Sequence, residues 1–143
     1  TSGIPMVIAG GLIPDVILDI MDNKNHGTYF VPKNVRLSSR KNWIAFTLKP
    51  EGRIYLDSGA VEAVVSRGKS ILPSGITDVA DNFDVGSPVQ FINHEGKTLG
   101  IGLVNYSASE IKKIMGVKSH VIETILGHKS YDEVIHRNNL VIT

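Results

Sequence analysis

The sequence predicts a mixed α/β protein in which a compact, mostly β barrel with short helices follows a strand–helix–strand segment. Three observations indicate this fold class. Apolar runs in the second half of the chain are short, and turn residues separate them. The helices expected between these runs are also short and end at glycines. The first third of the chain instead has the order and size of a single βαβ step.

The opening of the chain predicts part of a larger domain. Residues 4–9, IPMVIA, form a near-continuous apolar run, which is typical of a strand buried on both faces of a parallel sheet. Pro14 suits the start of a helix, and residues 28–31 follow as a second strand. Because one such step cannot bury both faces of its strands, we expect residues 1–33 to be the tail of a larger α/β domain. Residues 32–40 are polar and basic and are expected to form a linker or crossover.

The stretch of residues 57–76 is the element around which the second half is organised. Asp57 or Ser58 is expected to cap a short helix with one apolar stripe. Gly68 is expected to end that helix in the left-handed conformation, and residues 73–75 then form a tight turn.

The remaining pattern predicts strands on both sides of this helix. Ile44, Phe46 and Leu48 alternate as in a half-buried strand. Gly100 and Gly102 predict that another backbone or a helix lies close to their strand. The expected strands are residues 44–48, 53–57, 76–79, 89–92, 99–103, 134–136 and 140–142. One later helix is expected to start at the capping box 107–110 and to end at Gly116, and a second short helix is expected to follow and to end at Gly127.

Composition excludes several classes of protein. The 143 residues contain no cysteine, so a disulfide framework or a cysteine-ligated metal site is excluded. No apolar run reaches the roughly 20 residues that span a bilayer, and the N-terminus lacks a basic signal-peptide start. The net charge is +1, but residues 24–69 carry nine basic and three acidic side chains. This basic segment is either an anion-binding face or ordinary solvated surface.

Residues 57–104 resemble a PUA domain, the module of pseudouridine synthases and archaeosine transglycosylases. The residues that carry this resemblance are Gly59-Ala60, the run Gly68 to Ile76, the run Phe83 to Val89, and Gly100-Ile101-Gly102.

A wider resemblance covers nearly the whole chain. The runs Gly27 to Phe30, Leu37 to Phe46, Ile125 to Gly127 and Asp132 to Arg137 are similar to the C-terminal part of bacterial glutamate 5-kinase. In that family the end of an amino-acid-kinase domain leads into a C-terminal PUA domain. The resemblance therefore implies a βαβ remnant and linker of the kinase domain over residues 1–47 and a PUA domain over residues 48–143. The chain departs from the family pattern at Ala9-Gly10-Gly11 and near His128 and Tyr131.

The resemblance also implies what the parent enzyme does. Glutamate 5-kinases transfer the γ-phosphoryl group of ATP, with Mg²⁺, to the side-chain carboxylate of glutamate in proline synthesis. Their phosphate-binding loops precede the part of the family that this chain resembles. We therefore expect no catalytic residue, cofactor site or metal site in this chain, and a regulatory or structural role beside the missing kinase domain. A cytoplasmic location, no membrane partner, and association into a homo-oligomer are further expectations.

The alternative role is RNA binding. PUA domains elsewhere bind structured RNA through the helix and loop that correspond to residues 57–76. Carried onto this chain, the RNA-binding residues are Gly59, Ala60, Arg67, Gly68, Lys69 and Ser70. Arg67 is also explained by the helix dipole, and Tyr55 and Tyr106 are either base-stacking groups or half-buried strand ends.

The sequence gives little support for a phosphate, zinc or hydrolase site. Gly10-Gly11 is either a phosphate-binding turn or a plain turn, and it lacks a P-loop lysine. No histidine pair has the i, i+4 spacing of a helical zinc site. Ser70, Ser74 and Ser107 have no histidine–acid partner that spacing identifies, so a hydrolase triad is unsupported.

Overall fold

The computed structural model describes residues 5–31 and 39–143, and the chain forms two compact units, Thr1–Ser39 and Arg40–Thr143. Each unit is described by itself. The segment expected to form the linker lies mostly outside the described residues. In the sequence, the division between the two units falls between Ser39 and Arg40, ahead of the kinase–PUA boundary predicted between residues 47 and 48. That predicted boundary stays a prediction.

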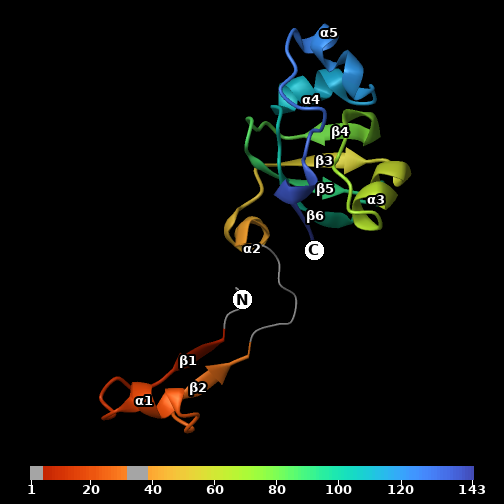
Figure 1. The fold of residues 1–143 in the computed structure, drawn as a ribbon. Coiled ribbons are helices and arrows are strands. Elements are labelled where there is room, and N and C mark those ends of the chain that lie inside the picture. Colours follow the sequence, from red (N-terminus) through yellow and green to blue (C-terminus); the bar gives the residue numbers. More distant parts are fainter. Residues whose placement is uncertain (1–4, 32–38) are drawn as a thin grey trace. The chain divides into compact units, whose positions relative to one another are not determined.

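The first unit contains strand β1 (Met6–Ile8), helix α1 (Val16–Met21) and strand β2 (Thr28–Phe30). Figure 1 shows β1 and β2 side by side and the helix in the segment that connects them. The strand–helix–strand order is confirmed, but the expected parallel pairing is wrong, because β1 and β2 pair antiparallel with Met6 opposite Phe30. Gly27 returns the chain at φ 86°, with its backbone so close to β1 that a Cβ would lie 2.1 Å from the Ile8 carbonyl oxygen. The helix therefore sits in a doubled-back connection rather than a crossover.

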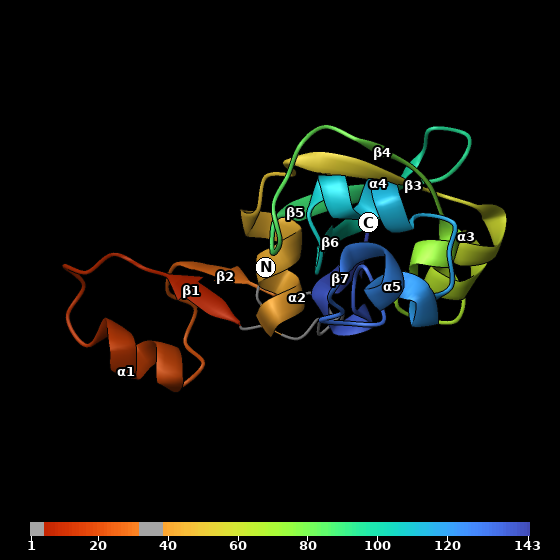
Figure 2. The same cartoon turned by 90° about the horizontal axis from the view of Figure 1, so that it is seen from above.

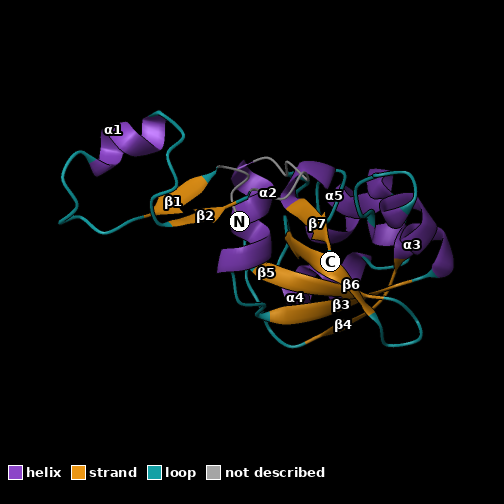
Figure 3. Cartoon of the chain, turned by 90° about the horizontal axis from the view of Figure 1, so that it is seen from below, coloured by secondary structure: helices purple, strands orange, loops and turns teal. Residues whose placement is uncertain are grey.

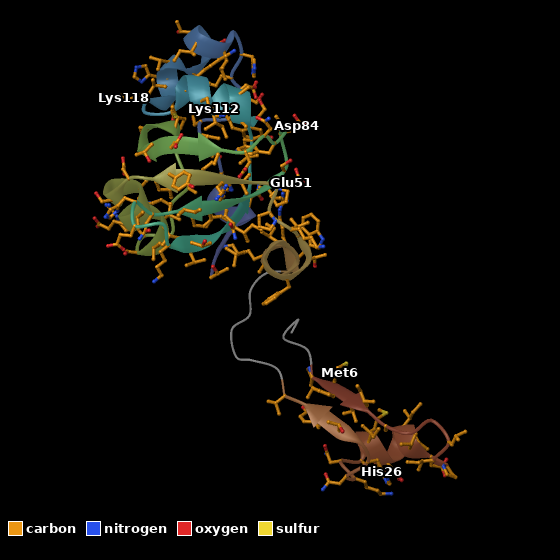
Figure 4. All side chains as sticks on the ribbon, turned by 180° about the vertical axis from the view of Figure 1, so that it is seen from behind. Met6, His26, Glu51, Asp84, Lys112 and Lys118 are labelled. Carbon is orange, nitrogen blue, oxygen red and sulfur yellow. The ribbon has the colours of Figure 1, made fainter. Side chains whose placement is uncertain are left out.

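Apolar side chains of the first unit are open to solvent in this chain. Met6 and Ile8 are 51% and 57% exposed, so the two-sided burial expected for this strand is not reached within the described residues. Figure 4 shows Met6 on β1 and His26 at the turn that leads back to β2.

The second unit is built on a five-stranded mixed sheet. Its strands are β3 (Gly52–Leu56), β4 (Ile76–Ala80), β5 (Pro88–Ile92), β6 (Thr98–Leu103) and β7 (Leu140–Ile142). Their order is β4-β3-β5-β6-β7, and only the β3–β5 pair is parallel. Figure 3 shows β3, β5 and β6 side by side in this sheet. The predicted barrel-like, mostly β architecture is confirmed.

Short helices cover the sheet. They are α3 (Ser58–Val65), α4 (Ala108–Ile114) and α5 (Ile122–Leu126), and 3₁₀ turns η1 (Pro73–Gly75), η2 (Ser119–Val121) and η3 (Arg137–Asn139) connect them. Figure 2 shows α4 and α5 on one side of the sheet and α3 at the end of β3. One core joins these elements, including Phe91, Tyr106 and Ile111, each no more than 1% exposed.

Glycines in β6 allow the close approach that the sequence predicted. A Cβ on Gly100 would lie 2.0 Å from the carbonyl oxygen of Val141 on β7. A Cβ on Gly102 would lie 2.8 Å from a methyl carbon of Ile135. Both distances are shorter than real Cβ contacts, so β7 and the segment before it can pack here only because these side chains are absent.

Two expected strands are corrected by the structure. Residues 44–48 do not form a strand, because helix α2 spans Ser39–Thr47. The three-residue alternation was too short to separate strand from helix, and the helix buries Ile44 completely while Phe46 is 71% exposed. Residues 134–136 form only an isolated bridge, Ile71 with Ile135, because this segment leaves the sheet to run beside the loop after α3.

None of the helices among the described residues is long and apolar enough to cross a membrane.

Candidate functional site

A groove of about 670 Å³ lies beside α3 and is the candidate functional site. Three segments form it: α3, the loop through η1 that follows α3, and the distant part of the chain that leads into η3. Its lining residues are Asp57, Gly59, Ala60, Ala63, Lys69, Ser70, Leu72, Ser74, Gly75, Glu133, His136 and Arg137. The volume falls in the range of roughly 300–1,000 Å³ that small ligands occupy.

Local capping and close packing place α3 at this groove. Asp57 caps the helix, and its carboxylate accepts a hydrogen bond of 2.7 Å from the backbone N–H of Ala60. The helix is followed by Gly68 at φ 60°, as predicted. Gly75 then brings η1 against the helix, since a Cβ there would lie 2.4 Å from that of Ala60. These contacts fix two walls of the groove.

Residues 131–137, which we call the strap, form the third wall. At its start, the hydroxyl of the buried Tyr106 donates to the Tyr131 carbonyl and accepts from the Tyr131 N–H at 3.1 Å. The side-chain amide of Asn105 donates to the carbonyl of Glu133 at 3.0 Å. At its end, the N–H of Arg137 donates to the hydroxyl oxygen of Ser70 at 3.0 Å. The strap is therefore tied to the core at one end and to the α3 loop at the other.

The charged residues that line the groove differ in exposure. Lys69 and Arg137 are exposed, whereas Asp57, Glu133 and His136 are half-buried. Glu133 makes no side-chain hydrogen bond or ion pair with the described residues. The ring Nδ1 of His136 accepts the N–H of Asn138 at 3.2 Å. This contact leaves the neutral ring its proton on Nε2, as a donor.

The structure brings together four of the six residues predicted to bind RNA. Gly59, Ala60, Lys69 and Ser70 line the groove. Arg67 and Gly68 are not among its lining residues, and Arg67 instead pairs with Glu62 at 3.4 Å on the outer surface of the helix. No contact in the structure tests RNA binding itself, so the assignment stays a prediction.

Sequence reasoning missed Glu133, His136 and Arg137 as members of this site. They are more than sixty residues from the α3 loop, and no periodicity links the two segments. The available signal was the run Asp132 to Arg137, which was recognised only as part of the family resemblance.

Several other residues take structural roles. Tyr106 is 1% exposed and its hydroxyl is hydrogen-bonded to the strap. Of the two roles considered for it, stacking on a base is therefore wrong. Gly10-Gly11 lies in the turn ahead of the six-residue α1. Among the described residues no group of three or more histidine and acidic side chains could hold a metal ion.

The capping box at α4 is a second cluster of charge. Glu110 accepts hydrogen bonds of 2.8 Å from both the N–H and the hydroxyl of Ser107, and its other oxygen lies 2.9 Å from the Nε2 of His128. Partial burial raises the pKa of the Glu110 carboxyl, but the bonds from Ser107 and His128 together outweigh it and hold that pKa below its ordinary value. The cluster anchors α4 to the chain after α5.

Comparison with known proteins places this fold in a family. Residues 52–126 match the PUA domain family. The chain belongs to the PUA domain family. The match includes α3, the loop after it and α4, and so contains two of the groove's three walls.

Curated relatives extend the similarity over the whole chain. The chain is 54% identical over 140 residues to a glutamate 5-kinase of Syntrophus aciditrophicus (strain SB), covering 98% of this chain and 36% of that protein. It is 49% identical over 141 residues to a glutamate 5-kinase of Thermoanaerobacter sp. (strain X514), covering 99% and 38%. The chain thus spans little more than a third of the length of these relatives.

Among solved structures, the PUA domain from Aeropyrum pernix K1, in a tartrate complex, aligns with a TM-score of 0.44 and 18% identity. That alignment covers 60% of this chain and 41% of the other.

Proposed function

We propose that this chain is the C-terminal portion of a glutamate 5-kinase and serves as its non-catalytic, regulatory or bracing module. The observation that carries the proposal is the 54% identity over 140 residues to a protein of that name, of which the chain spans only 36%. The complete enzyme would transfer the γ-phosphoryl group of ATP, bound with Mg²⁺, to L-glutamate in proline biosynthesis. It would do so in the cytoplasm.

The exposed apolar side chains of the first unit support this proposal. β1 and α1 present Met6, Ile8, Ile17 and Met21 to solvent, each at least half exposed. Exposed apolar groups in such density indicate a surface that packs on further protein. The missing kinase domain is the partner that the relatives suggest, and a second copy of the chain is the other.

A direct assay tests the catalytic part of the proposal. The isolated chain and a complete relative, such as the enzyme of Syntrophus aciditrophicus, are each incubated with ATP, Mg²⁺ and glutamate. We expect glutamate-dependent ADP release from the complete enzyme and none from the isolated chain. Turnover by the isolated chain would contradict the proposed division of labour.

The second function we propose is RNA binding in the groove. The favouring observation is that Gly59, Ala60, Lys69 and Ser70 face one cavity together with Arg137. The two exposed cations would contact phosphates, which fix position and make affinity dependent on salt. Because each neutralised phosphate releases counterions, Lys69→Ala and Arg137→Ala are each expected to reduce the salt slope by about one.

A matched control for these variants is Lys97→Ala. Lys97 is exposed in the hairpin between β5 and β6 and is not among the lining residues of the groove. Fluorescence anisotropy with labelled tRNA is the measurement. Absent or salt-insensitive binding would refute the RNA function, and an equal loss in Lys97→Ala would refute its location.

A further inference from the structure

The charged residues that line the groove differ in exposure, and this difference carries an inference that rests on the proposed RNA function. The cations Lys69 and Arg137 are exposed, and Glu133 and His136 are half-buried. A nucleotide has the complementary layout, since its phosphate is charged and its base carries a hydrogen-bonding edge on a flat apolar body. Ala60, Ala63 and Leu72 supply apolar wall for such a body.

Glu133 is the informative group. Glu133 is half-buried, its side chain has no hydrogen bond or ion pair with the described residues, and its backbone carbonyl accepts a hydrogen bond from Asn105. An ionised carboxylate only accepts hydrogen bonds, so a ligand that covers it without offering donors would leave it unpaired at a cost in free energy. A ligand that offers donors at this point is therefore favoured. A second phosphate of a polyanion would instead be repelled there.

The other carboxylate in the groove is already in use. Asp57 commits one oxygen to the N–H of Ala60, at 2.7 Å, as the cap of α3. His136 contributes the opposite chemistry, because its Nδ1 accepts the N–H of Asn138 and Nε2 keeps the proton. The groove lining thus holds Glu133, whose carboxylate has no partner among the described residues, and His136, whose ring presents an N–H donor at Nε2.

We propose that Glu133 reads the base of one unstacked nucleotide and selects bases that carry an exocyclic amine, guanine above the others. The Watson–Crick edge of guanine presents two parallel donors, N1–H and N2–H, which a carboxylate accepts together. Cytosine and adenine each offer one amine donor beside an acceptor. Uracil flanks its single N–H with two carbonyl oxygens, which a carboxylate repels. Proteins read unstacked RNA bases on this edge.

The size of the effect follows from base recognition in general. A good bidentate pair discriminates against the wrong base by roughly fivefold or more. We therefore expect the affinity for a guanine nucleotide to exceed that for a uracil nucleotide by at least about fivefold. The exposed Arg137 would contact phosphate and affect all four nucleotides alike.

The test is an NMR titration of the whole chain with the four nucleoside 5′-monophosphates and with inorganic phosphate. We expect the amide signals of Glu133 and Lys69 to shift and the affinity order to place GMP first and UMP last. Glu133→Gln should bring the GMP-to-UMP ratio close to one, and Glu123→Gln, on the exposed surface of α5, should leave it unchanged. Arg137→Gln should weaken all four monophosphates by a similar factor.

A second arm separates free nucleotides from RNA as the source of this base. Oligouridine with one guanosine insert is compared with oligouridine alone. If the chain prefers the oligonucleotide with guanosine, loses that preference in Glu133→Gln and does not distinguish the monophosphates, the site reads RNA alone. If it prefers guanine in both arms, the site accepts guanine from RNA and from free nucleotides. Equal affinity for all bases in both arms, or a ratio that Glu133→Gln does not change, overturns the inference while RNA binding stands. No binding of any probe overturns the proposed RNA function and this inference with it.

Discussion

Removing the hydroxyl of Tyr106 should loosen the strap and destabilise the second unit. The hydroxyl donates to the carbonyl of Tyr131 and accepts its N–H, and the Tyr106 side chain is 1% exposed. Tyr106→Phe keeps the buried ring and its packing but deletes both hydrogen bonds. Tyr131 itself is 53% exposed, so water can partly replace the lost partner. The expected loss in unfolding free energy is therefore about 1 to 2 kcal/mol rather than the full cost of two buried unpaired groups.

Chemical denaturation with urea, followed by circular dichroism, measures this loss. The midpoint should fall with little change in the m-value, and the melting temperature should fall by roughly 5 to 10 °C. The matched control is Tyr55→Phe, because Tyr55 is half-buried in β3 and its hydroxyl makes no hydrogen bond with the described residues. If Tyr106→Phe costs no more than Tyr55→Phe, the strap is not held as described.

Three further outcomes follow from the same structure. Gly100→Ala should destabilise the chain by about 2 kcal/mol or more, since its Cβ would meet the Val141 carbonyl at 2.0 Å, whereas Gly59→Ala in the exposed helix α3 should be neutral or stabilising by thermal melting. Ser107→Ala should cost about 1 kcal/mol in urea denaturation by removing the cap of α4, and an equal loss in Ser58→Ala would argue against the capping role. Because the pKa of Glu110 is lowered in the folded chain, its contribution to stability is present above the ordinary carboxyl pKa of 4.5 and is lost as the pH falls through the lower folded value. Glu110→Gln should therefore flatten the decline of stability below that pH, and an unchanged decline would refute the assignment.

Local chemistry made much of the second unit predictable. Residue type alone predicts three features of this unit: the Asp57 cap, the capping box of Ser107 and Glu110, and the close backbone approach at Gly100 and Gly102. These features depend on neighbours close in sequence or on a missing side chain.

The failures came where a distant partner decides the structure. The alternation of Ile44, Phe46 and Leu48 was read as a strand, but burial of Ile44 selects helix α2. The direction of β2 depends on the close approach of Gly27 to Ile8. The spacing of apolar residues in the sequence does not reveal this contact. The groove was predicted only in part for the same reason, since Ile71 and Ile135 are brought together by the fold.

The charge of a sequence segment does not predict which of its side chains reach the groove. The basic segment over residues 24–69 suggests an anion-binding face, yet among its cations that the structure describes only Lys69 lines the groove. Arg53 pairs with Asp81 at 3.0 Å, and Arg67 pairs with Glu62. Figure 4 shows two cations that lie outside this segment, Lys112 on α4 and Lys118 in the turn after it. The position of a cation in the fold, more than its place in a segment, decides which anion it can contact.

The claim about the site itself is the proposal that RNA binds in the groove between α3 and the strap. The most direct measurement is the slope of log affinity against log salt concentration for labelled tRNA, in the unaltered chain and in the double variant Lys69→Ala/Arg137→Ala. The account predicts a steep slope that becomes shallower by about two in the double variant. An identical slope in both proteins, or affinity that does not change with salt, would contradict it.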